Sequence, residues 1–269
     1  MTGPASRYAS DTYYLETWDA LVAAKVDPDA FSRRNALLLL KPDAAITGTM
    51  RPAVSWLLAT GYRIIGAYAV NLTGLHIRAL WYFNWHRATR ERRRLADRLA
   101  GLSLSVVLVV THPDDSAPVS FRLTADKGPA DPAQRESGQL RSALSARTYL
   151  LNLVHSADDP DDVLRELGIY FAEPHLSEVI SVCATGADAS AEAFGIVDRI
   201  ESGVNRRSGD LTVAQDAIWD ELLASGMTER PQSRDEWLSA LDEAGRRDIR
   251  LDTWFRTVIE SAYLPMHRA

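Results

Sequence analysis

The sequence of 269 residues has a single cysteine, Cys183, and only three lysines beside 27 arginines. One cysteine can form neither an intrachain disulfide nor a cysteine-based metal site, which favours a reducing, cytoplasmic setting. No apolar run approaches the roughly 20 residues that span a bilayer. The opening segment also lacks the basic flank and apolar core of a signal peptide. These absences predict a cytoplasmic protein with no membrane partner.

The chain also has no excess of positive charge, because its net charge is −6. This balance argues against a dedicated nucleic-acid surface. The hydrophobic content of 46% is typical of a globular protein with a real core. The length suits one domain plus an extension.

Four segments read as strands, because they are apolar or rich in β-forming residues: 35–40, 62–72, 104–112 and 148–154. Helical spacing is predicted over 50–61, in one or two helices within 73–101, and from Pro160 to about Phe171. The stretch 113–139 has little regular pattern, although "VSFRL" suggests short structure. This order predicts an α+β fold, a ferredoxin-like, mainly antiparallel four-stranded sheet with helices.

The ends of the chain differ from this core. A short helix is expected near residues 17–25, and four amphipathic helical segments follow residue 181. We therefore divide the chain into an N-terminal extension (1–32), a sheet domain (33–180) and an all-α extension (181–269). The last could cover a sheet edge, form an oligomer interface or close over the active site.

One histidine stands out, because an apolar run ends at His155 and a helix follows one turn later. In that helix Val163, Leu167 and Tyr170 form an apolar stripe, and Glu166 lies on or beside the same inward face. A carboxylate turned inward is costly unless it is paired. If it accepts from one imidazole nitrogen of His155, the other nitrogen is free as a nucleophile. The alternative is a capped structural histidine.

Two motifs resemble those of nucleoside diphosphate kinases. "LLLLKPDAAITG" (37–48) is similar to the lysine-proline-aspartate strand end of that family, and "NLVHSADD" (152–159) to its asparagine-x-x-histidine segment. The resemblance covers roughly residues 33–180 and includes the order of the core elements. It identifies 33–180 as a nucleoside diphosphate kinase-like domain.

The resemblance implies phosphoryl transfer from a nucleoside triphosphate such as ATP, through a phosphohistidine, to a diphosphate acceptor. His155 would be the nucleophile and Glu166 its orienting carboxylate. Lys41 would reach the ribose hydroxyl and the transferred phosphoryl, Asn152 would bind the sugar, and Tyr82 would brace the histidine.

Phosphate contacts are implied for Arg141 in "SGQLR" and for Arg122 in "SFRL", the latter across a one-residue gap. Mg²⁺ is expected on the nucleotide phosphates and not on protein side chains. The resemblance further implies a homo-oligomer, at least a dimer.

The chain departs from the family pattern in three places. The segment "ATRERRR" (88–94) has no aromatic to stack on the base, so Arg90 or Trp85 would take that place. "DKGP" puts Lys127 where the family has a phosphate-binding threonine, and Ala157 replaces a serine after the histidine.

Three functions therefore stay open at this point. The chain is an active phosphohistidine kinase for nucleoside diphosphates, a related enzyme whose acceptor is a small phosphorylated metabolite, or an inactive nucleotide-binding or scaffold protein on the same fold.

Overall fold

A four-stranded antiparallel sheet forms the centre of the computed structural model, which describes residues 7–268. Its strands are β1 (Asn35–Leu40), β2 (Arg63–Val70), β3 (Ser105–Thr111) and β4 (Val154–Ser156), in the order β2-β3-β1-β4. This confirms the predicted ferredoxin-like α+β fold.

The two central strands, β1 and β3, are continuously apolar because both faces of the sheet are covered. All six residues of β1 are buried. Alternate residues enter two separate cores: Leu37 and Leu39 belong to one, Leu38 and Leu40 to the other. The alternation follows from the two-residue period of a strand.

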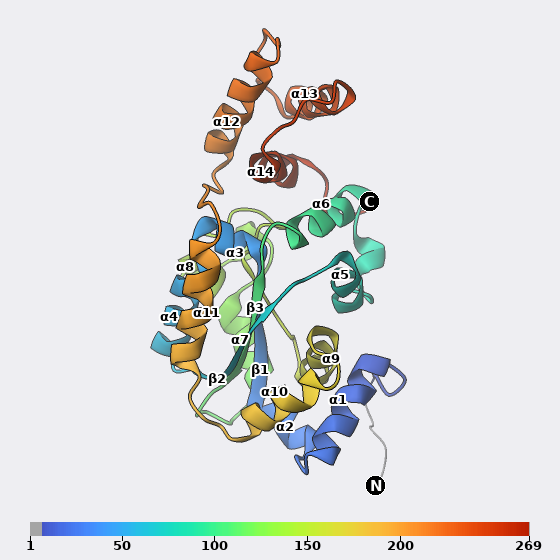
Figure 1. Ribbon diagram of the computed structural model, residues 1–269, viewed down its shortest axis with the longest axis vertical. Coiled ribbons are helices and arrows are strands. Elements are labelled where there is room, and N and C mark those ends of the chain that lie inside the picture. Colours follow the sequence, from blue (N-terminus) through green and yellow to red (C-terminus); the bar gives the residue numbers. More distant parts are fainter. Residues whose placement is uncertain (1–6, 269) are drawn as a thin grey trace.

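Helices cover each face (Figure 1). The face with Leu39 packs against helices from both ends of the domain: α1 (Thr12–Ala23), α5 (Gly74–Leu80), α6 (Arg90–Ala100), α9 (Pro160–Tyr170) and α10 (His175–Ala184). The face with Leu38 packs against α4 (Met50–Ala59), α7 (Val119–Lys127), α8 (Leu140–Ala143) and α11 (Ser190–Ser202), with the short α3 (Pro42–Thr47) at its edge. The remaining short helix, α2 (Pro28–Arg34), leads directly into β1.

The fourth strand differs from the prediction. Residues 148–153 are irregular, Leu153 has a positive φ of 69°, and only Val154–Ser156 pair with β1. Side chains hold this bend, since Lys41 Nζ donates to the Leu150 carbonyl (2.8 Å) and Asp43 Oδ2 accepts from the Leu153 amide (2.9 Å). His155 therefore lies within the strand, opposite Leu39, and not after its end.

In the stretch 113–139 the short structure suggested at "VSFRL" is confirmed, but it is longer than expected, because α7 extends over Val119–Lys127. The helix from Pro160 is confirmed. Asp159 is its N-cap and accepts from the Asp162 amide, while Pro160 occupies the first turn.

The four helices predicted beyond residue 181 are confirmed as α11, α12 (Leu211–Ala224), α13 (Arg234–Arg246) and α14 (Thr253–Tyr263). α11 belongs spatially to the sheet domain, because it packs on β2 and α4 and the Ala189 amide donates to the Ile64 carbonyl (2.8 Å). The α10–α11 connection thus covers part of the β2 edge.

Helices α12–α14 project from the sheet domain and return the C-terminus to α6 (Figure 1). Within residues 7–268, no helix has the length and apolar character needed to cross a bilayer.

Candidate active site

A cavity of about 860 Å³ opens on the sheet face that carries Leu39. Its walls come from the end of β1, from α5 to α6, from α7, from the 139–152 segment and from α9. Six of the predicted site residues line it: Lys41, Lys127, Arg141, Asn152, His155 and Glu166.

The imidazole of His155 is held by Glu166. His155 Nε2 lies 2.8 Å from Glu166 Oε1, and the two side chains are 15% and 6% exposed. The second carboxylate oxygen accepts from the Tyr170 hydroxyl at 3.3 Å. Because the carboxylate accepts, Nε2 carries the proton and Nδ1 keeps its lone pair. Within residues 7–268, nothing hydrogen-bonds to Nδ1.

Local sequence explains why these two groups meet. β4 places His155 on the face of the sheet that α9 covers, and every residue of α9 from Val163 to Tyr170 is buried. Glu166 is therefore largely shielded from water, and its carboxylate is hydrogen-bonded to the imidazole and to the Tyr170 hydroxyl.

The aromatic residue that packs on His155 is Trp81 and not Tyr82. The Trp81 and His155 rings meet edge to face at 5.2 Å. Tyr82 is 67% exposed, contacts the Phe83 ring and does not line the cavity. The prediction for Tyr82 was wrong because α5 ends at Leu80, and the turn that follows directs Tyr82 outward.

Lys41 lies at the end of β1 and is buried. Besides the bond to the Leu150 carbonyl, its Nζ is 3.5 Å from Asp43 Oδ2. Burial lowers the pKa of Lys41, while the Asp43 carboxylate opposes this effect and the Arg141 guanidinium adds to it.

Two further cations complete this part of the cavity. Lys127, at the end of α7, donates to Ser156 Oγ at 2.6 Å and is 3.5 Å from Asp158 Oδ1. Burial, together with the Arg141 guanidinium, lowers the pKa of Lys127 to about 8, and the Asp158 carboxylate partly opposes this effect. Arg141 donates to the carbonyls of Gly128 (2.8 Å) and Val154 (2.6 Å), and burial lowers its pKa to about 10.

Two of the predicted arginines lie elsewhere. Arg122 pairs with Asp114, and Arg90 is exposed at the start of α6; neither lines the cavity. The prediction for Arg122 was wrong because this residue lies on a side of α7 that does not face the cavity. In α7 it is Thr124 and Lys127 that face the cavity, and Arg122 lies two residues, over half a turn, away from Thr124.

The sequence reasoning missed three residues near the cavity mouth. Tyr149 lines it, the Arg92 guanidinium lies 4.8 Å over the Tyr149 ring, and the His267 ring meets the same tyrosine edge to face at 4.7 Å. Asn152 Nδ2 donates to the Tyr149 carbonyl (2.9 Å). Arg92 was two positions from the chosen Arg90, whereas no local pattern marks His267.

The chain's last described residues place His267 there. The Arg268 amide donates to the Arg87 carbonyl (2.9 Å), and Thr89 Oγ1 donates to the Pro265 carbonyl (2.6 Å). The all-α extension therefore covers part of a sheet edge through the segment that leads into α11, and its end supplies part of the wall of this cavity.

These features agree with the relationships of the chain. The sequence model of the family "Nucleoside diphosphate kinase" matches residues 34–176, which is more than half of the chain. The chain therefore belongs to the nucleoside diphosphate kinase family. Members are kinases of the nucleoside diphosphate kinase type, use nucleoside triphosphates with Mg²⁺, and are typically oligomeric.

Curated relatives include nucleoside diphosphate kinases of Thermococcus kodakarensis and Thermomicrobium roseum. The first is 27% identical over 144 residues, which are 53% of this chain and 79% of the relative. The second is 29% identical over 140 residues, which are 52% of this chain and 89% of the relative.

Solved structures that resemble the chain include the Aquifex aeolicus nucleoside diphosphate kinase, with a TM-score of 0.44 and 19% identity over 52% of this chain and 96% of that one. Another is a transition state mimic of the Borrelia burgdorferi enzyme with bound vanadate and ADP, with a TM-score of 0.45 and 16% identity over 52% of this chain and 88% of that one.

Proposed function

We propose that this protein transfers the γ-phosphoryl group of a nucleoside triphosphate through His155 to a nucleoside diphosphate or a related phosphorylated acceptor. The observation that carries the proposal is the hydrogen bond of 2.8 Å between His155 Nε2 and Glu166 Oε1 inside the cavity. It fixes the tautomer in which Nδ1 is the nucleophilic nitrogen.

In the first step the Nδ1 lone pair of His155 attacks the γ-phosphorus. An N–P bond forms, the bond from the γ-phosphorus to the bridging oxygen breaks, and the diphosphate leaves with that electron pair. Glu166 stabilises the positive charge that develops on the ring and keeps the Nε2 proton in place. In the second step a terminal phosphate oxygen of the acceptor attacks the same phosphorus, an O–P bond forms, and the N–P bond breaks with its electron pair returning to Nδ1, which regenerates the histidine.

Lys41, Lys127 and Arg141 would bind the phosphates, since all three are buried cations in the wall of the cavity. Burial lowers the pKa of each one, and a polyphosphate would counter this by compensating the buried charge. Asn152 would bind the sugar, at the side where Tyr149 lies. Asp158, Asp159 and Asp162 also line the cavity, so carboxylate oxygens are present beside the path of a nucleotide.

Mg²⁺ suits this arrangement as a companion of the nucleotide. Among residues 7–268, no group of three or more His, Cys, Asp or Glu side chains could hold a metal ion, so we assign no protein ligands to it. Bound to the phosphates, Mg²⁺ would neutralise the charge that spreads over their oxygens during transfer.

The direct test is incubation with γ-³²P-labelled ATP and Mg²⁺. The expected product is an acid-labile, base-stable phosphoenzyme that is absent in His155→Ala. His175→Ala is the matched control, since His175 is exposed on α10 and lies outside the cavity. Adding nucleoside diphosphates or phosphorylated metabolites to the labelled protein then identifies the acceptor. Wild-type protein that takes up no label would refute transfer.

A nucleotide-binding or scaffold role without transfer is the second candidate. It is favoured by Ala157, which is fully buried where the family has a serine, and by the helical extension, whose end places His267 against Tyr149 in the cavity wall. ATP binding in a thermal-shift titration without any phosphoenzyme would select it.

We also propose a cytoplasmic homo-oligomer, at least a dimer. The α10–α11 connection covers part of the β2 edge, so such a dimer would use another surface. Light scattering coupled to size exclusion measures the assembly.

A further inference from the structure

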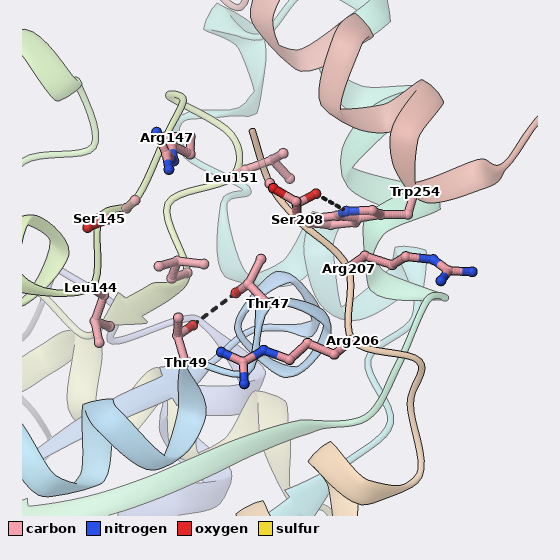
Figure 2. A pocket seen from close by; sticks show the side chains of 13 residues that line it. Thr47, Thr49, Leu144, Ser145, Arg147, Leu151, Arg206, Arg207, Ser208 and Trp254 are labelled. Atoms are coloured by element: carbon pink, nitrogen blue, oxygen red, sulfur yellow. Dashed lines mark hydrogen bonds between the residues drawn. The ribbon is translucent and has the colours of Figure 1, made fainter. Parts of the chain in front are cut away.

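A second cavity, of about 400 Å³, lies between the sheet domain and α14 (Figure 2). It is bounded by the α3–α4 turn, by the 144–153 segment and by the link between α11 and α12. The residues that line it are Thr47, Thr49, Leu144, Ser145, Ala146, Arg147, Leu151, Leu153, Arg206, Arg207, Ser208, Gly209 and Trp254.

The charge of this lining is positive. It contains three arginines, and none of its described residues is acidic, although the whole chain has a net charge of −6. Arg147 is 3.6 Å from Asp210, so its ion pair is loose. Arg207 lies 3.8 Å from Asp252 and extends away from Arg206 in Figure 2, toward the side of Trp254. Within residues 7–268 Arg206 makes no ion pair within 4.0 Å, although its charge interacts with the Glu201 carboxylate. Arg206 is therefore the arginine most available to a ligand, and Arg147 would exchange its loose ion pair with Asp210 for the ligand.

The guanidinium of Arg206 lies over Gly48, where a Cβ atom would be 2.8 Å from the guanidinium carbon. Gly48 has a φ of +68°, a backbone conformation that disfavours a larger residue. In Figure 2 the Arg206 side chain reaches toward Thr49 at the start of α4. Thr47 and Thr49 place their hydroxyls 3.1 Å apart on the same wall.

The link that carries Arg206 is anchored on both sides. The Arg207 amide donates to the Ile46 carbonyl (2.9 Å), and Trp254 Nε1 donates to the Ser208 carbonyl (2.8 Å). The two bonds connect the link to α3 on one side and to α14 on the other. This is a preformed wall, and preformed walls reduce the entropic cost of binding.

We propose that this cavity binds a small organic anion that carries a phosphate group. Arg147 and Arg206 provide planar cationic donors from two sides, and the hydroxyls of Ser145 and Ser208 provide neutral ones, a combination suited to phosphate oxygens. The Thr47 and Thr49 hydroxyls donate to the Asp43 and Ala44 carbonyls, so they shape the wall and do not donate to the ligand. Trp254 and Leu151 provide an apolar surface for the rest of the ligand. The volume lies in the range of small-molecule sites.

This site is separate from the catalytic cavity, although they share a wall. Leu151 and Leu153 face the second cavity, whereas Leu150 and Asn152 line the catalytic one. Its occupancy can therefore be measured without any transfer activity.

Tryptophan resonances distinguish the two cavities, because Trp254 lines the second and Trp81 and Trp85 line the catalytic one. We would titrate ¹⁵N-labelled full-length protein with inorganic pyrophosphate at constant ionic strength. The indole N–H signals are assigned by Trp→Phe variants. The Trp254 signal should shift and saturate, and Arg206→Ala should weaken that response by about tenfold or more, as expected for a lost charged hydrogen bond. Movement of the Trp81 and Trp85 signals tests the proposed function separately.

Arg234→Ala is the charge-matched control, because Arg234 is exposed at the start of α13, and it should leave the Trp254 titration unchanged. Arg147→Ala should weaken binding as Arg206→Ala does. A Trp254 signal that does not move would overturn the proposal. So would a shift that never saturates, or a titration of Arg206→Ala and Arg147→Ala that is as strong as that of the wild type.

Discussion

Replacing Glu166 by glutamine tests the central geometric claim with little change of shape. The carboxylate accepts from His155 Nε2 through Oε1 and from the Tyr170 hydroxyl through Oε2. Glutamine has one acceptor oxygen and one NH₂ group. If its oxygen faces Tyr170, the NH₂ group faces the imidazole and donates to Nε2. The ring proton then moves to Nδ1, the nitrogen that must attack.

The size of the effect follows from the bond that is lost. A hydrogen bond to a charged group contributes about 1.5–3 kcal/mol. The His155–Glu166 bond is short, and both side chains are largely shielded from water, so solvent screening is weak. At about 1.4 kcal/mol for each factor of ten, phosphoenzyme formation should slow by about 10- to 100-fold. The wrong tautomer would add to this loss.

Rapid-quench measurement of ³²P incorporation from labelled ATP gives the rate directly. Tyr170→Phe is the matched control, because it removes a bond of 3.3 Å to the same carboxylate and leaves the carboxylate in place. We expect it to slow labelling less than about tenfold. Glu166→Gln protein that is labelled at the wild-type rate would refute the orienting role.

Two further predictions concern charge. Because burial lowers the pKa of Lys127 to about 8, its ammonium loses charge above that pH, and ATP affinity measured by calorimetry should fall by up to about tenfold per pH unit there. Lys127→Met should bind weakly with a flatter pH profile, and wild-type affinity that stays constant through this range would contradict the assignment. Glu260 is buried and accepts from Arg98 and Arg256, so Glu260→Ala should lower the free energy of unfolding in urea by about 3 kcal/mol. Glu243→Ala breaks only an exposed ion pair and should cost less than about 1 kcal/mol; an equal loss in both variants would show that the Glu260 network does not anchor α14.

The sheet was largely predictable because its information is local. β1 and β3 are continuous apolar runs, which is the pattern of strands covered on both faces. β4 was predicted too long, because "TYLLNLV" has the composition of a strand although its backbone groups form hydrogen bonds with distant side chains. Lys41 donates to the Leu150 carbonyl and Asp43 accepts from the Leu153 amide, and both side chains lie more than 100 residues earlier in the chain.

The part of the site that depends on helical spacing was predictable. Glu166 lies three residues after Val163 in α9, and this spacing places its carboxylate on the side of the helix that faces His155. The predictions for Tyr82 and Arg122 were wrong because the direction of each side chain depends on where a helix ends or how it is rotated about its axis. A helix end can shift by a residue or two without any change in the sequence pattern. His267 could not be found at all, because its place depends on how α12–α14 fold back to α6.

The buried cations and the histidine carry different information about function. Lys41, Lys127 and Arg141 would serve a binding protein as well as an enzyme, since each only needs an anion to offset its buried charge. A scaffold has no comparable use for an imidazole whose Nε2 is fixed by a buried carboxylate while Nδ1 has no hydrogen-bond partner among residues 7–268. Burial of the Glu166 carboxylate costs free energy in the folded protein. The result of that burial is a fixed orientation of the His155 ring. For this reason we favour transfer over binding alone, and measurement of the His155 phosphoenzyme decides between them.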